Sequence, residues 1–262
     1  PASGMQACGE EGMGRMLEAE ELAAAIVTFL QGNGQTRRVS RGLLQKTGQP
    51  EPRLEGVKIL MTAGPTYEAI DAVRGITNRS SGKMGYAVAQ AALEAGAQVT
   101  LVSGPVALAA PPGARLVPVT SAAEMFEAVK RHVTECQVFI GVAAVADYRP
   151  AQPRQEKMKR GKGAISLELL PNPDILGYVA ALNPPPFCVG FAAETGNLRE
   201  QAQAKRAAKK IPLLAANLAQ EAIGAEDNAL TLFDDAGEHV LPRAPKLVQA
   251  RALIRHIATL IS

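Results

Sequence analysis

From residue 57 onward the chain alternates short apolar runs with amphipathic segments, and this alternation restricts its fold more than any other feature. The runs VKILMT (57–62), QVTLVS (98–103) and QVFIGV (137–142) have the length of buried strands, with helix-forming segments between them. Parallel strands need long crossover connections, which are usually helices. The sequence therefore predicts an α/β fold built on a doubly wound, mostly parallel, Rossmann-like three-layer sheet.

Residues typical of helix caps predict where the helices begin and end. A helix over about 81–95 ends at Gly96, where a C-cap glycine is expected, and Ser121 with Glu124 has capping-box spacing at the start of another. A third helix is expected to begin near Asn197. These helices supply the crossovers that the strands require.

The end of the sequence predicts an antiparallel addition to the sheet. After further strands at 187–191 and 212–217, the segments ALTLFD and EHVL are joined by a short turn at 235–237. They predict a small hairpin at the sheet edge. A final helix is expected to begin near Pro245, since proline is favoured in a first helical turn.

The chain divides into two regions. Its 262 residues, 47% of them apolar, can bury one sizeable core plus a smaller attachment. Residues 17–30 carry apolar positions at helical spacing, whereas 31–53 have the composition of a linker. We therefore place a boundary near Pro52, between a region of residues 1–52 and a main domain of residues 53–262. Because the chain opens on PASGMQACGE without an initiating Met, we expect it to be a fragment of a longer protein.

Charge and composition exclude several classes of protein. The 28 Lys and Arg against 25 Asp and Glu give no reason to expect a partner that is nucleic acid or membrane. Cys8, Cys136 and Cys188 lack C-x-x-C spacing, which argues against a disulfide framework or a zinc site. No apolar run approaches the ~18 residues of a spanning helix and no signal peptide opens the chain, so a cytoplasmic protein is expected.

Residues 78–85 are the first candidate ligand site. Ser80, Gly82 and Gly85 let a phosphate approach the backbone, and the helix that follows offers free N–H groups and the positive end of its dipole. The spacing is neither the dinucleotide G-x-G-x-x-G nor a Walker A loop, since Met84 follows the Gly-Lys. The alternative is a tight turn that needs glycine only for packing.

Two residues upstream are also candidates. Gly64 leaves the first strand where a doubly wound fold places a turn that faces the ligand. Arg74 could clamp a carboxylate or a phosphate with two parallel hydrogen bonds. The alternative for Arg74 is a surface ion pair with Glu68 or Asp71.

A further group follows the strand predicted at 137–142. Small residues at 142–146 leave room for a ligand, and Asp147 could hold a ribose hydroxyl, a base amine or a magnesium ion. Asp147 could instead only cap the loop. The segment 172–174 also has two interpretations: it could contact the ligand, or Asn172, which precedes a proline, could be an ordinary helix N-cap.

Basic and aromatic residues further along could bind a nucleotide. Phe191 ends a strand and could stack on a base, although an aromatic residue there is more often core. Lys205 and Lys209 lie one helical turn apart, so a phosphate would relieve their repulsion; a solvated basic stripe is the common alternative. The long connection 143–164 has no regular pattern and carries Lys157, so it is either a lid over an anionic ligand or a solvated loop.

Five motifs occur in order from about Val57 to the end of the chain: TAGPTYEAIDAVRGITNRSSGKMG, GVAAVADYRP, EKMKR, NPDI and GFAAET. Together they resemble the phosphopantothenoylcysteine synthetase family, in the bacterial form fused behind a phosphopantothenoylcysteine decarboxylase. The resemblance implies that residues 53–262 join 4'-phosphopantothenate to cysteine at the expense of CTP, on the way to coenzyme A. It also implies Mg²⁺ and a homodimer.

Carried over residue by residue, the resemblance implies a set of nucleotide contacts. These are Gly64, Ser80, Gly82, Gly85, Gly141, Val142, Ala143, Asp147, Lys157, Pro171, Asn172, Pro173, Asp174, Phe191, Lys205 and Lys209. The residues implied for phosphopantothenate are Arg74, Asn78, Ala143 and Ala144, with Asn78, Lys157 and Arg74 in catalytic roles. Arg160 stands where the family often has a further lysine, which keeps the charge but leaves its role open.

The first region resembles the decarboxylase half of the same family. PASGMQACGEEGMGRM is similar to the clamp segment that closes over substrate there, and the cysteine of ACG, which is Cys8 here, is a catalytic proton donor in that family. The flavin-binding sheet that should precede this segment is missing, so FMN is expected only in the missing half. Residues 1–52 are therefore expected to be a remnant of clamp, helix and linker in which Cys8 is idle.

The implied reaction activates the acid first. The phosphopantothenate carboxylate attacks the α-phosphate of CTP, giving an acyl-cytidylate and pyrophosphate, and the amine of cysteine then displaces CMP. Lys157, Lys205 and Lys209 suit the first step together with Mg²⁺. Asn78 would hold the acyl group in the second step.

Two rival interpretations remain from the sequence. A nicotinamide-dependent oxidoreductase would use the same fold, but G-x-G-x-x-G is missing, and His132, His239 and His256 are placed on helices or a hairpin away from the site. A non-catalytic nucleotide-binding module is the second rival.

Overall fold

The structure is a computed structural model that describes residues 2–5, 11–15, 53–161, 163–194, 196–218 and 225–262. The chain divides into two compact units, Pro1–Glu51 and Pro52–Ser262. In the first unit, strands β1 (Ala2–Met5) and β2 (Glu11–Arg15) form an antiparallel pair. The helix predicted at 17–30, most of the linker predicted at 31–53, and Cys8 lie outside the described residues.

An eight-stranded sheet in the order β14-β13-β12-β11-β8-β3-β6-β7 forms the centre of the second unit. Its strands are β3 (Lys58–Ala63), β6 (Gln98–Ser103), β7 (Arg115–Pro118), β8 (Val138–Gly141), β11 (Phe187–Glu194), β12 (Leu213–Leu218), β13 (Asp227–Asp234) and β14 (Gly237–Pro245). The pairs from β7 through to β12 are parallel, and β12, β13 and β14 pair antiparallel. The predicted parallel sheet with an antiparallel hairpin at its edge is confirmed.

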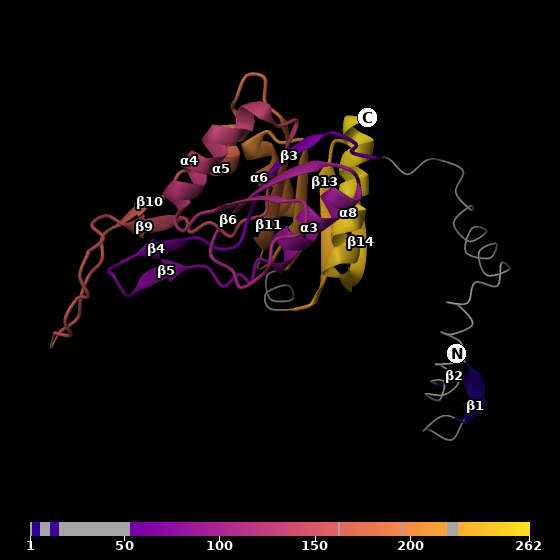
Figure 1. Cartoon of the computed structure of the whole chain (residues 1–262), viewed down its shortest axis with the longest axis horizontal. Coiled ribbons are helices and arrows are strands. Elements are labelled where there is room, and N and C mark those ends of the chain that lie inside the picture. The colour runs from indigo at the N-terminus through magenta and orange to yellow at the C-terminus, as the bar shows by residue number, and fades with distance from the viewer. Residues whose placement is uncertain (1, 6–10, 16–52, 162, 195, 219–224) are drawn as a thin grey trace. The chain divides into compact units, whose positions relative to one another are not determined.

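Helices cover both faces of this sheet (Figure 1). They are α3 (Lys83–Glu94), α4 (Ala122–His132), the short 3-10 helix η1 (Val133–Glu135), α5 (Ile175–Ala180), α6 (Leu198–Lys209) and α8 (Lys246–Ile261). Helices α3 and α8 contribute to one buried cluster, and α4, α5 and α6 contribute to another. Because side chains alternate along a strand, Ile59 and Met61 lie in the first cluster and Leu60 in the second. This gives the three predicted layers.

The end signals act largely as predicted. Gly96 follows α3 with φ of 93°, a conformation that glycine adopts without strain. Ser121 caps α4 by accepting a 3.2 Å hydrogen bond from the backbone N–H of Glu124. The carboxylate of Glu124 accepts a 2.6 Å hydrogen bond from the N–H of Thr120. In the usual capping box it would accept from the N–H of the N-cap residue itself, which is Ser121. Pro245 is the N-cap of α8 and not part of its first turn, which corrects the prediction by one residue.

Two small antiparallel pairs lie outside the main sheet. One joins β4 (Tyr67–Ala69) to β5 (Gly75–Thr77), and the other joins β9 (Tyr148–Pro150) to β10 (Leu169–Pro171). The expectation that 143–164 has no regular structure is therefore wrong at β9. Strands of three residues are too short to show a periodicity. Within the described residues, no helix is both long enough and apolar enough to cross a bilayer.

Candidate functional site

The carboxyl ends of β3, β8 and β11 open into a cavity of about 670 Å³. A doubly wound sheet binds its ligands at this edge, and a volume of this size suits a small-molecule site. The predicted site residues that line it are Gly64, Asn78, Ser80, Gly82, Gly85, Gly141, Val142, Ala143, Ala144, Asp147, Asn172, Pro173, Asp174, Phe191, Lys205 and Lys209. Arg74, Lys157 and Pro171 are not among the lining residues.

The turn before α3 brings backbone to the cavity wall. Gly82 is the N-cap of α3 with φ of 74°, and its N–H donates to the hydroxyl of Ser80 at 3.3 Å. A Cβ on Gly85 would lie 2.6 Å from the Cβ of Ala63, so the helix packs directly against β3 only because residue 85 is glycine. Packing of the helix against the sheet therefore depends on Gly85. The first N–H groups of α3 have no partner within the helix and can receive an anion here.

Asn78 fastens this turn to the segment that follows β8. Its Nδ2 donates to the carbonyl oxygens of Ala144 at 3.2 Å and Val145 at 2.9 Å. The backbone of Ala144 also donates to the carbonyl oxygen of Gly64 at 2.9 Å. A carboxamide nitrogen carries two N–H donors, and both are engaged here. A substrate oxygen that binds to Asn78 would therefore replace one of these carbonyls.

The two lysines predicted on α6 each face a carboxylate at the cavity. Lys209 forms an ion pair with Asp174, and the Nζ of Lys205 lies 3.8 Å from a carboxylate oxygen of Glu194. Burial, the largest influence, raises the pKa of Asp174, but hydrogen bonds from Lys209 and from the backbone of Gly177 outweigh it and lower the pKa. These lysines are therefore matched with acids, and an incoming polyanion would compete with those acids.

The site also contains lysines that the sequence analysis did not select. Lys83 opens α3 and pairs with Glu226, whereas Lys246 opens α8, and both line the cavity. The pKa of Lys246 is lowered, first by burial and then by the charge of Lys83. Lys83 lies inside the 78–85 motif and could have been selected there. Lys246 carries no local signal, because only the fold brings α8 to this edge.

In the segment before α5, the alternative role of Asn172 as a helix N-cap is not observed. Asp174, and not Asn172, is the N-cap: its Oδ1 accepts from the N–H of Gly177 at 3.0 Å. Asn172 instead donates its Nδ2 to the carbonyl oxygen of Ala146 at 2.9 Å, and its backbone N–H to that of Asp147 at 2.8 Å. Asn172 lies too far before the helix to cap it, and its carboxamide joins two walls of the cavity.

Arg74 and the segment of Lys157 lie together outside the cavity lining. The Nε of Arg74 donates to Oδ2 of Asp71 at 2.9 Å, so the alternative ion pair is present, with Asp71 and not Glu68. Arg74 also donates to the carbonyl oxygen of Met158 at 3.0 Å, and the N–H of Met158 donates to Asp71 at 3.1 Å. These bonds fasten the arm between β9 and β10, which extends away from the sheet (Figure 1), to the β4–β5 pair.

Comparison with known proteins identifies similar sequences over the whole chain. The family described as DNA/pantothenate metabolism flavoprotein C-terminal domain matches residues 54–261. The coenzyme A biosynthesis bifunctional protein CoaBC of Vibrio vulnificus (strain CMCP6) is 44% identical over 267 residues, covering 100% of this chain and 62% of that protein. The CoaBC protein of Escherichia coli (strain K12) is 42% identical over 266 residues, covering 99% and 61%. The chain thus spans less than two thirds of the length of these relatives.

Solved structures agree with this match. The crystal structure of the C-terminal domain of a CoaBC protein superposes with a TM-score of 0.70 at 38% identity, covering 81% of this chain and 98% of that chain. A Cab2 mutant in complex with phosphopantothenate-cysteine superposes with a TM-score of 0.67 at 17% identity, covering 78% and 87%. At that identity the second likeness shows the shared fold alone.

Proposed function

Because this chain belongs to the family of the DNA/pantothenate metabolism flavoprotein C-terminal domain, we propose that its second unit is a ligase that joins 4'-phosphopantothenate to cysteine in coenzyme A biosynthesis, with CTP as co-substrate. The names of the CoaBC relatives support the pathway. The proposal covers residues 53–262; FMN and decarboxylation are assigned to the other half of such proteins.

One observation carries the proposal: lysines from three helices meet at a single cavity beside the first turn of α3. They are Lys83 of α3, Lys205 and Lys209 of α6, and Lys246 of α8. Lys83, Lys205 and Lys209 each face a carboxylate, and a triphosphate could replace those acids as the partner of the lysines. Helix N–H groups with converging lysines are the usual means of holding a transferred phosphoryl group.

The proposed first step is attack of the phosphopantothenate carboxylate on the α-phosphorus of CTP. The carboxylate oxygen forms a bond to phosphorus while the bond to the bridging oxygen of pyrophosphate breaks, leaving an acyl-cytidylate. Negative charge grows on the departing pyrophosphate, where Lys205 and Lys209 can neutralise it. Mg²⁺, which prefers oxygen ligands, would be held by the phosphates and by Asp147, the carboxylate after β8, and would add positive charge there.

In the proposed second step the cysteine amine attacks the acyl carbon, CMP leaves, and the amine loses a proton. Asn78 lies between the phosphate turn and the backbone at Ala144, so we place the acyl group there. Its side-chain N–H groups are neutral donors that can stabilise an oxyanion without reacting with the anhydride.

Arg74 and Lys157 need a different account because neither lines this cavity. We propose that they act on substrate when the arm between β9 and β10 moves over a filled cavity together with the β4–β5 pair to which it is bonded, or when two chains associate as a homodimer and these segments of one chain serve the other. Closure of such a segment would shield the acyl-cytidylate from water.

The test is pyrophosphate release with CTP, phosphopantothenate and cysteine, followed by chromatography of the products. We expect CMP, pyrophosphate and phosphopantothenoylcysteine in equal amounts, with a lower rate when ATP replaces CTP. Without cysteine, about one pyrophosphate per site should appear in a burst, because the intermediate cannot be consumed. Binding of CTP without any pyrophosphate in the complete mixture would reject the ligase and favour a non-catalytic nucleotide-binding module.

A further inference from the structure

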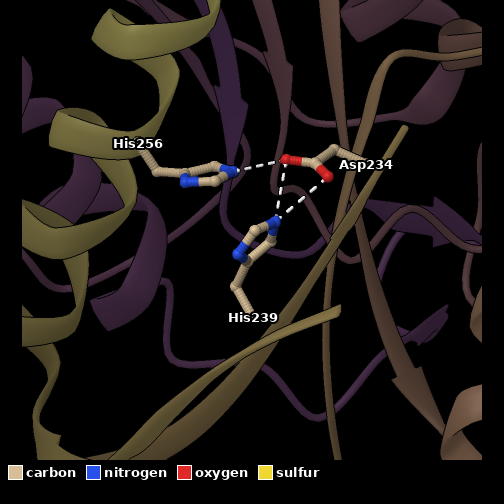
Figure 2. Close-up of side chains that lie close together, drawn as sticks. All are labelled: Asp234, His239 and His256. Carbon is tan, nitrogen blue, oxygen red and sulfur yellow. Dashed lines mark hydrogen bonds and ion pairs between the residues drawn. The ribbon is translucent and has the colours of Figure 1, made fainter. Parts of the chain in front are cut away.

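Three side chains from three elements converge at the hairpin edge of the sheet, away from the nucleotide cavity. Figure 2 shows the rings of His239 of β14 and His256 of α8 both directed at the carboxylate of Asp234, at the end of β13. The Nε2 of His239 lies 3.1 Å from both carboxylate oxygens of Asp234, and the Nε2 of His256 lies 2.8 Å from Oδ2. None of the three lines the cavity.

The three side chains offer atoms of the kinds that bind transition metals. One oxygen and two imidazole nitrogens lie within 4.8 Å of one another. Ligands at ~2.0–2.2 Å from a tetrahedral zinc ion lie roughly 3.3 Å apart, so the distances of 2.8 and 3.1 Å need only a small expansion. A neutral imidazole can present Nε2 as a lone pair instead of an N–H, so the nitrogens that now hydrogen-bond can also ligate.

The carboxylate is held in place by the hairpin turn. Its Oδ1 accepts hydrogen bonds from the N–H groups of Ala236 at 2.8 Å and Gly237 at 3.1 Å. Such bonds orient a ligating carboxylate from the side opposite the metal. Asp234 has a side chain only 3% exposed, whereas His239 and His256 are 37% and 20% exposed, so an ion can reach the cluster from the histidine side.

The carboxylate of Asp234 lies in a largely buried position with both imidazole rings directed at it. A divalent cation placed among these three groups would be bound by an oxygen and two nitrogens in a site partly shielded from water.

We propose that Asp234, His239 and His256 bind a zinc-class divalent transition metal at a site that is independent of the nucleotide cavity. Two imidazoles with one carboxylate suit zinc, cobalt or iron, whereas magnesium and calcium prefer oxygen ligands. Three protein ligands leave a position for water. The ion would join the β13–β14 hairpin to α8. Cysteine spacing could not reveal such a site, because no cysteine contributes to it.

The test uses the full chain, freed of metal by a chelator and without nucleotide or Mg²⁺. Titration with Co²⁺, followed by its visible absorption and then by Zn²⁺ displacement, should show one tight site per chain. Zn²⁺ should also raise the melting temperature. In His239→Gln and His256→Gln the affinity should fall at least tenfold, whereas His132→Gln, which changes the remaining histidine on α4, should bind as the wild type does.

Two further variants keep the outcome interpretable. Asp234→Asn retains an oxygen that can accept the two turn N–H groups, so the hairpin should fold while metal affinity falls. His239→Gln/His256→Gln measures binding elsewhere on the chain, including at Cys8. The proposal is overturned if the wild type binds Co²⁺ and Zn²⁺ no more tightly than this double variant, because the cluster would then be only a set of hydrogen bonds.

Discussion

The side-chain amide of Asn78 donates a 2.9 Å hydrogen bond to the carbonyl oxygen of Val145, joining the turn before α3 to the segment after β8. A second bond from the same nitrogen reaches Ala144. One side chain thus holds together the two walls between which phosphate transfer and acyl transfer would meet. Substitutions at residue 78 should therefore affect the reaction more than the binding of CTP.

Asn78→Asp removes both N–H donors and places a negative charge against two carbonyl oxygens. We expect pyrophosphate release to fall by about 10²–10³-fold, because one donor to a developing oxyanion is worth that much. The dissociation constant of CTP should change less than tenfold. Single-turnover measurements of acyl-cytidylate and CMP would locate the blocked step. Turnover at the wild-type rate would remove Asn78 from the mechanism.

Lys209→Gln removes one cation from the cavity and leaves Asp174 without its partner. Its affinity for CTP should fall about ten- to a hundredfold, since a hydrogen bond to a charged group contributes about 1.5–3 kcal/mol. Lys210→Asn is the matched control: residue 210 is exposed and does not line the cavity, and its φ of 52° is one that asparagine tolerates. Equal losses in both variants, measured by calorimetry, would show that α6 acts only through its overall charge.

Gly85→Ala tests the contact between α3 and β3. The new methyl group would lie 2.6 Å from the Cβ of Ala63, and overpacking of this kind costs about 1–3 kcal/mol. Urea unfolding should show that loss, together with weaker CTP binding as the helix start moves. Ala63→Gly in the same chain removes the clashing atom and should restore part of the CTP affinity. Failure of the double variant to recover would place the strain elsewhere.

Asp71 predicts a specific loss of stability in acid. Hydrogen bonds from Arg74, the largest influence, hold the pKa of Asp71 well below its usual range although burial raises it. A lowered pKa stabilises the fold fully above the unfolded value of about 3.9, and this stabilisation is lost as the pH falls toward the folded value. The free energy of unfolding, measured with denaturant, should therefore fall less steeply between about pH 6 and pH 3 in Asp71→Asn than in the wild type. If the free energy of unfolding fell equally with pH in both proteins, the stabilising role of the ionised Asp71 would be contradicted.

The two described cysteines should be slow to react. Burial raises the pKa of Cys136 to about 11 and that of Cys188 to about 12. At pH 8 roughly a thousandth or less of either thiol is then the reactive thiolate. In a Cys8→Ser background, a thiol reagent should label the folded chain far more slowly than the chain in denaturant. Rapid labelling of one folded thiol would show that its surroundings open readily.

Much of the fold was predictable because its evidence is local. A short stretch of sequence is enough to predict the strand of residues 57–62, the helix ending before Gly96 and the cap at Ser121. The pair of β9 with β10 was missed, because strands of three residues gain their order from each other across an intervening arm. The hydrogen bond from Asn172 to Ala146 could not be predicted for the same reason, because the two residues are distant in sequence.

The residues of the candidate site also differ in whether a local sequence signal identifies them. Gly82 and Gly85 were recognised because the helix start is a local motif, whereas Lys246 was not, since the fold alone brings α8 to the cavity. The convergence of Asp234 with His239 and His256 likewise depends on how a hairpin packs against a helix. The hairpin itself was predicted from its turn residues.

Strand β3 lies between β6 and β8, and its Ile59 pairs with Val138 of β8. Bringing such distant positions together costs chain entropy before any contact compensates for it, so this pairing should be a slow event in folding. The cavity floor is made from the ends of β3 and β8, and no ligand can bind before those ends meet. During refolding, CTP binding should consequently recover later than helical circular dichroism, which makes the nucleotide a reporter of when the central sheet closes.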